Sequence, residues 1–348
     1  MNLINSFSYA FIFSILLSFV MLHFLKKKNW LIDKVNTSSH KRLTSIFSSS
    51  KTVLCGGIII FICSVVFLDH ELYVLKILGG CMLIVGILSD TNKFNSPKFR
   101  FIIQFLIVLL LLVLNQNLAI TDLRINFIRD ILEIKFFSIL FTIFCILILI
   151  NGSNFLDGVN TLILGYYILV MGVIITTSIQ FNLNLNPNIF YLLIFLCTVY
   201  MFNFFNKIYL GDAGSYLISF FTAFFILDFF SMNLTVSPYF ICLLLWYPAF
   251  ENLFSILRRV FFKSDLAKAD QGHLHQLIYQ FFVHNKFFEK KYLNTITGTL
   301  INLFIFLIFA IFYNYYSFTK FLVLAIFLNI IIYMFLYFII KKKLNHFK

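Results

Sequence analysis

The chain has 348 residues, of which 61% are hydrophobic and 12% are charged, with a mean hydropathy of +0.95. A soluble domain has about 45–50% apolar and about 25% charged residues, so this composition excludes an ordinary soluble fold and requires lipid as part of the solvent. The formal net charge of +13 would suggest nucleic acid as a partner of a soluble protein. In a membrane protein, the usual excess of Lys and Arg in the cytoplasmic loops explains a positive net charge, so we expect no nucleic-acid partner.

The N-terminal stretch is the first predicted transmembrane helix. Residues 1–25 carry no Lys, Arg, Asp or Glu, and Lys26, Lys27 and Lys28 follow directly. A cleaved signal peptide would place its positive charge before the apolar stretch and not after it. We therefore expect a retained helix whose N-terminus lies outside.

Further apolar stretches continue along the chain. A helix needs about 20 mostly apolar residues to cross the hydrocarbon. The sequence predicts an all-α polytopic membrane protein of about eleven transmembrane helices, forming a single domain over 1–348. The predicted spans are 6–25, 52–68, 72–88, 101–118, 136–152, 161–179, 188–204, 214–231, 237–254, 294–313 and 321–340. They hold few charges, chiefly Asp228.

The basic residues predict the orientation. Most of the 27 Lys and Arg fall in alternate connections between the spans, which predicts an outer N-terminus and an inner C-terminus. The predicted inner segments are 26–51, 89–100, 153–160, 205–213, 255–293 and 341–348. The longest of these, 255–293, is amphipathic and aromatic, so we expect it to lie against the membrane surface and to bind substrate.

Polar clusters interrupt the apolar background at 86–100, 151–160, 203–215 and 258–276, with a weaker one at 31–57, and all are predicted to face the cytoplasm. Asp90, Asp157 and Asp212 each sit at a predicted helix end, beside Gly and Asn or Ser. A single aspartate is tolerated at a helix end that is in contact with water. Three of them in a chain with so few charges indicate a functional site. Carboxylates near Lys and His suit Mg²⁺ bound together with a diphosphate substrate.

The same clusters resemble a known family, the polyprenyl-phosphate N-acetylhexosamine-1-phosphate transferases (glycosyltransferase family 4, MraY/WecA-like). The family pattern GxxDD…SxKxRxxxQ resembles residues 86–104, and NxxNxxDGxDGL resembles 151–160 and the residues after them. KIFMGDxGS resembles 207–215, and the histidine motif resembles 270–276. The sequence YPAFENLFSILRR…HLHQLIY resembles that of the family branch whose members start O-antigen, lipopolysaccharide or other surface polysaccharides in cell-wall biogenesis.

The resemblance implies transfer of a sugar 1-phosphate from a UDP-N-acetylhexosamine to undecaprenyl phosphate, with release of UMP. It implies Mg²⁺, with Mn²⁺ as a substitute, a bacterial inner-membrane location with the active site facing the cytoplasm, and a homodimer as one expected assembly. By matching position, Asp90, Asp157 and Asp212 would be catalytic, with Asp212 as the Mg²⁺ ligand and Asp90 as a second candidate. The residues expected to bind substrate are His40, Asn151, Asn154, Asn160, Asn203, Lys207, Arg259, Asp270, His273 and His275.

The sequence departs from the family pattern in several places. Ser89 replaces the first aspartate of the family's pair, and serine cannot supply a metal-binding carboxylate. Asn160 and Gln276 replace a second acid and a third histidine, and Val35 and Ser38 stand where Pro and Arg are usual. A catalytically impaired homologue that binds lipid phosphate or nucleotide therefore stays an alternative. A secondary transporter is a further one, disfavoured because such proteins bind substrate at polar groups near the bilayer midplane.

Overall fold

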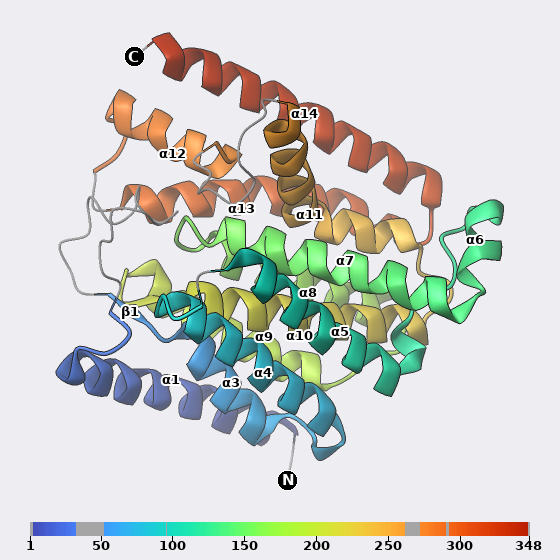
Figure 1. The fold of residues 1–348 in the computed structure, drawn as a ribbon, viewed down its shortest axis with the longest axis horizontal. Coiled ribbons are helices and arrows are strands. Elements are labelled where there is room, and N and C mark those ends of the chain that lie inside the picture. Colours follow the sequence, from blue (N-terminus) through green and yellow to red (C-terminus); the bar gives the residue numbers. More distant parts are fainter. Residues whose placement is uncertain (1–2, 33–51, 95, 262–271, 290–291, 347–348) are drawn as a thin grey trace.

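The computed structural model describes residues 3–32, 52–94, 96–261, 272–289 and 292–346, and almost all of them are helical. The long helices run side by side along one direction of the molecule (Figure 1). Eleven helices coincide with the predicted spans. They are α1 (Leu3–Lys28), α3 (Gly56–Phe67), α4 (Tyr73–Asp90), α5 (Pro97–Leu114), α7 (Lys135–Leu156), α8 (Leu162–Phe181), α9 (Asn188–Phe204), α10 (Gly211–Met232), α11 (Pro238–Phe261), α13 (Leu293–Phe312) and α14 (Thr319–His346).

Nine of these helices are long and apolar enough to cross a membrane, whereas α3 and α9 are shorter. The structure therefore confirms a polytopic membrane protein, and the total of eleven crossings stays a prediction. α3 is short because the chain before it pairs as a strand: β1 (Val53–Leu54) lies parallel to β2 (Ile208–Tyr209). This two-stranded pairing joins the segment before α3 to the segment before α10.

Other differences concern the connections. α11 continues to Phe261, so the beginning of the predicted loop 255–293 is helical. The same loop contains α12 (Leu274–Asn285), which packs against α13 and α14 through residues buried at its N-terminal half (Figure 1). α6 (Asn126–Leu132) is a short helix between α5 and α7 that the apolar pattern did not predict. Single 3-10 turns follow α3, α5 and α13 at His70–Leu72, Gln116–Leu118 and Tyr313–Tyr315.

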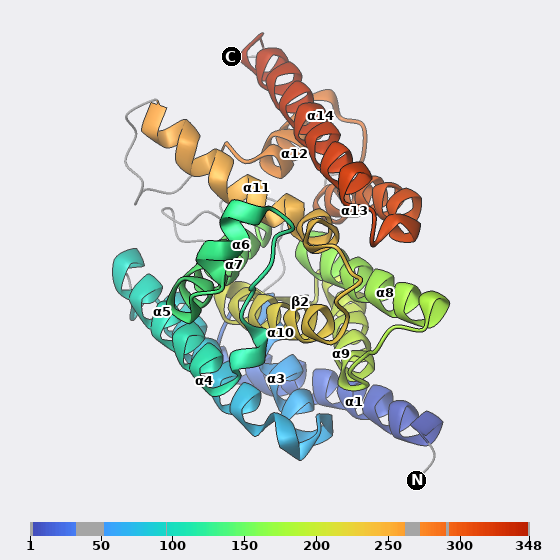
Figure 2. The same ribbon diagram turned by 90° about the vertical axis from the view of Figure 1, so that its right-hand side faces the viewer.

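α10 lies at the centre of the bundle, with α3, α4 and α7 packed around it (Figure 2). It is apolar on every side, as a helix surrounded by other helices must be. α3 and α4 approach the first turn of α10 so closely that only glycine fits at the contact positions on these two helices. A Cβ on Gly86 of α4 would lie 2.2 Å from Ala213 Cα, and one on Gly57 of α3 would lie 2.5 Å from Gly214 Cα. These contacts fix the start of α10 against the ends of two other helices.

Candidate active site

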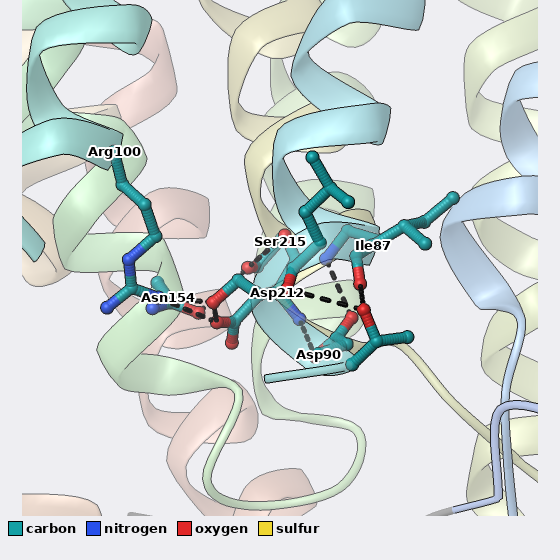
Figure 3. Close-up of polar contacts among 10 residues, drawn as sticks. Ile87, Asp90, Arg100, Asn154, Asp212 and Ser215 are labelled. Carbon is teal, nitrogen blue, oxygen red and sulfur yellow. Dashed lines mark hydrogen bonds and ion pairs between the residues drawn. The ribbon is translucent and has the colours of Figure 1, made fainter. Parts of the chain in front are cut away.

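The first turn of α10 meets the last turn of α4. Asp90, the final residue of α4, accepts hydrogen bonds from the backbone N–H groups of Asp212 at 3.0 Å and Ala213 at 3.1 Å (Figure 3). The first N–H groups of a helix have no partner within it, and a carboxylate there also interacts favourably with the helix dipole. Asp90 thus caps α10 from a different helix. Gly211, just before, has φ +73°, a left-handed conformation that glycine adopts without strain.

Asp212 is the centre of the site. Ser89 Oγ donates to Asp212 Oδ2 at 2.5 Å, and Arg100 Nη1 lies 3.2 Å from the same oxygen. Arg100, from the first turn of α5, also donates to Ser89 Oγ. The Asp212 and Arg100 side chains are 18% and 22% exposed, so the ion pair is accessible to a ligand from one side. The residue that replaces the family's first aspartate therefore lies in contact with the predicted metal ligand.

The C-terminal end of α7 completes this side of the site. Ser215 Oγ donates to Asn154 Oδ1 at 3.0 Å, which brings Asn154 beside the first turn of α10 (Figure 3). One turn earlier, Asn151 Nδ2 lies 3.5 Å from Gln104 Oε1 and donates to a backbone carbonyl of its own helix. Asp157 is half-buried at the C-cap of α7. The structure thus brings Asp90, Asn154 and Asp212 together from the ends of α4, α7 and α10, with Asn151 and Asp157 on the same end of α7 as Asn154.

Two predicted substrate-binding asparagines have structural contacts. Asn203, in the last turn of α9, accepts from the Thr161 N–H at 2.7 Å and donates to the Ile208 carbonyl at 2.8 Å. Asn160 donates its side-chain amide to Asn206, and its backbone N–H is bonded to Asn294. Both side chains are buried. They hold the turn between α7 and α8 against α9 and α13, and their predicted contact with substrate stays a prediction.

The histidine pair lies at the start of α12. The rings of His273 and His275 stack with centroids 5.5 Å apart, and Phe155 also stacks with His273, with centroids 4.9 Å apart. A Cβ on Gly158 would lie 3.3 Å from His275 Nε2. Both histidines are buried against the turn that follows α7. The structure therefore brings the 151–160 and 273–276 clusters into contact.

Of the other predicted site residues, two lie within the described part of the chain and two lie outside it. Lys207 is exposed immediately before β2, and Arg259 is buried in the last turns of α11. His40 and Asp270 fall outside the described residues, as do Val35 and Ser38. Burial raises the pKa of Tyr279, on α12, to about 12, with a smaller effect from Tyr209 of β2.

A known protein family matches the part of the chain that contains Asp90, Asn154 and Asp212. The pattern of "Glycosyl transferase family 4" matches residues 72–230, which run from α4 through α10 and include the Asp90–Asp212 contact. Over these residues the chain is similar to that family. It is also 23% identical over 286 residues to a Bacillus subtilis (strain 168) protein described as "Probable undecaprenyl-phosphate N-acetylglucosaminyl 1-phosphate transferase", with 78% of this chain and 77% of that protein covered.

The oxygen atoms at the site fit the Mg²⁺ ion that the sequence predicts. Among the residues that the structure describes, no three His, Cys, Asp or Glu side chains gather to hold a metal ion. Mg²⁺ does not need such a cage, because it is commonly held by one or two carboxylates together with substrate phosphates and water. Asp212 offers a carboxylate, Ser89 a hydroxyl and Asn154 an amide oxygen nearby. This set of hard oxygen donors fits Mg²⁺ held jointly with a diphosphate.

Sequence reasoning missed three residues that contact the predicted site residues. Arg100 lies within the 86–104 motif, which was the signal that could have identified it. Ser215 closes the 207–215 motif and contacts Asn154. Glu251 had no comparable signal: it lies in a predicted span, where we named only Asp228 as a charge, yet it is buried and contacts His273 at 2.9 Å. Its partner is 22 residues away, beyond the end of its own helix.

Proposed function

We propose that this chain transfers N-acetylhexosamine 1-phosphate from a UDP-linked donor to undecaprenyl phosphate and releases UMP, which starts a lipid-linked glycan of the cell envelope. One observation carries the proposal: motif residues from α4, α5, α7 and α10 meet at Asp212, at one end of a bundle of membrane-spanning helices. The family match and the name of the Bacillus subtilis relative support the same reaction.

The reaction needs little proton transfer. A phosphate oxygen of the lipid attacks the donor phosphorus that bears the sugar, a new P–O bond forms, and the P–O bond to UMP breaks. The lipid phosphate is largely ionised near neutral pH, so the attacking oxygen needs no strong general base. Positioning of the two anionic substrates and neutralisation of their charge are then the main demands on the protein.

The site residues meet these demands in different ways. Arg100 places a guanidinium beside Asp212, where it can contact phosphate oxygens through a planar set of donors. The N-terminus of α10 presents partial positive charge to the same region, and Asp90 keeps that turn in place. Mg²⁺, when bound at Asp212, would supply further charge neutralisation to the diphosphate. Asn151, Asn154 and Asp157 are expected to line the nucleotide pocket.

The location follows from the substrates. The site lies at the ends of spanning helices, where a lipid phosphate at the membrane surface and a water-soluble nucleotide can meet. Together with the distribution of Lys and Arg, this supports a bacterial inner-membrane protein whose site faces the cytoplasm. Accessibility of an introduced cysteine at Lys207, with Thr235 as the matched position at the other end of the bundle, would test the orientation.

The central test is formation of a labelled lipid. Proteoliposomes that contain the protein, undecaprenyl phosphate and Mg²⁺ should convert UDP-[¹⁴C]GlcNAc or another UDP-N-acetylhexosamine into an organic-soluble product. Asp212→Asn should abolish the product. Asp228→Asn is the matched control, because Asp228 is a carboxylate of the same helix that contacts Asn186 far from the site. If no donor of the panel gives product with the wild-type protein, the transferase proposal fails and a phosphate-binding homologue becomes the better explanation.

A further inference from the structure

Glu251 is a carboxylate in the middle of an apolar environment. It lies on α11, one of the candidate membrane spans, and is only 1% exposed. An ionised carboxylate without partners in such a place would be strongly destabilising, so its charge must be compensated. The compensation comes from three donors on two other segments of the chain.

The three donors divide between the two carboxylate oxygens. Oε1 accepts from His273 Nδ1 at 2.9 Å and from the Leu274 N–H at 3.3 Å, and Oε2 accepts from the Tyr333 hydroxyl at 2.7 Å. Leu274 is the first residue of α12, and Tyr333 lies on α14. Glu251 therefore links α11 to both helices and also occupies the N-terminus of α12, where a negative charge is favourable.

The contact with Oε1 determines the state of the His273 ring. A carboxylate can only accept a hydrogen bond, so Nδ1 of His273 carries a proton and the ring is held in one orientation. Phe155 and His275 both stack with this ring, which is itself buried, and this packing supports the same orientation. The Nε2 side of His273 is thereby set relative to the 151–160 motif, which supplies Asn154 and Asp157 to the site.

From this geometry we propose that Glu251 is a positioning residue for the donor diphosphate. It fixes the tautomer and direction of His273, which is the residue expected from the sequence to contact the nucleotide-sugar phosphates. The proposal rests on the transferase function proposed above. Glu251 itself touches no substrate, so its effect on the reaction passes through His273.

Two substitutions separate the hydrogen bonds of Glu251 from its charge. In Glu251→Gln, the Leu274 N–H requires an acceptor at the Oε1 position, so the amide oxygen takes that place and His273 keeps its Nδ1 proton. The amide NH₂ then faces the Tyr333 hydroxyl, which can accept. In Glu251→Leu, all three donors lose their acceptor. We expect Glu251→Gln to stay within about fivefold of wild type, whereas Glu251→Leu should raise the KM for the UDP-sugar by about tenfold or more.

The kinetic pattern distinguishes positioning from a general loss of structure. The KM for undecaprenyl phosphate should change less than about twofold in both variants. Asp228→Asn, which alters another buried carboxylate, should leave both KM values unchanged. The double variant Glu251→Leu/His273→Leu should be no more than about twofold worse than His273→Leu alone, because one residue acts through the other. Additive losses, or a Glu251→Leu enzyme that behaves like Asp228→Asn, would overturn the proposal.

A spectroscopic measurement tests the same contact without activity. ¹⁵N-histidine NMR of the full protein in detergent, with the His273 signal assigned by its loss in His273→Leu, should show protonated Nδ1 in wild type and in Glu251→Gln. Glu251→Leu should lose this preference. A His273 signal that is the same in all three proteins would refute the positioning role. Absence of labelled lipid with the wild-type protein would count instead against the transferase function, and the NMR result would still decide what Glu251 does to His273.

Discussion

Replacing Gly86 by alanine should disable the site although it removes no polar group from it. The added Cβ would lie 2.2 Å from Ala213 Cα and 2.4 Å from Ala213 N, both of which are backbone atoms of α10. An ordinary carbon–carbon contact is about 3.5 Å or more, so α4 and α10 must separate by about 1.3 Å. The two hydrogen bonds from Asp90 to α10, now 3.0 and 3.1 Å, would then be broken.

The magnitude follows from these contacts. Overpacking costs about 1–3 kcal/mol, and loss of a helix N-cap costs about 0.5–2 kcal/mol. The free energy of unfolding should therefore fall by about 1.5–5 kcal/mol. A displacement of about 1 Å at a site can cost about 100-fold in rate, and Asp212 is the residue whose backbone would be displaced.

The assay compares Gly86→Ala with Gly172→Ala. Gly172 lies on α8, and a Cβ there meets no atom within 4 Å, so alanine should be neutral or slightly stabilising. Thermal unfolding in detergent and formation of labelled lipid are measured on both variants. If Gly86→Ala equals Gly172→Ala in unfolding temperature and lies within twofold of it in activity, the close approach of α4 to α10 does not position Asp212.

Three further substitutions test other parts of the structure. Ser89→Asp adds a second carboxylate beside Asp212, so the apparent affinity for Mg²⁺ should rise about tenfold, as read from the Mg²⁺ dependence of labelled-lipid formation. An unchanged dependence would mean that this protein does not use that position for the metal. Arg100→Met removes the cation that lies 3.2 Å from Asp212, so Mg²⁺ should bind up to about fivefold more tightly while turnover falls through loss of a phosphate contact. Arg124→Ala, at the end of the bundle away from the site, removes hydrogen bonds from Arg124 to the loops before α11 and α14. It should lower the unfolding temperature by about 2–4 °C and leave both KM values unchanged, and altered kinetics would contradict a purely structural role.

The sequence alone determined the positions of the helices. Apolar stretches of about 20 residues have one stable form in lipid, because every backbone polar group must be bonded within the segment. Each predicted span accordingly coincides with a helix of the structure. The motifs also located Asp90, Asn154 and Asp212, because polar groups are rare in such a chain and each sits where a helix ends.

The tertiary structure decided which groups meet. Asp90 and Asp212 are 122 residues apart, and only the close packing of α4 on α10 makes one the cap of the other. Asn160 and Asn203 carry the same residue type as Asn154, and only the fold shows that they join the turn after α7 to α13 and α9. Glu251 is a single acidic residue in an apolar stretch of the sequence, and only the fold places His273, at the start of α12, beside it. Local chemistry fixes where helices form, whereas the role of a polar side chain depends on partners that the chain brings from far away.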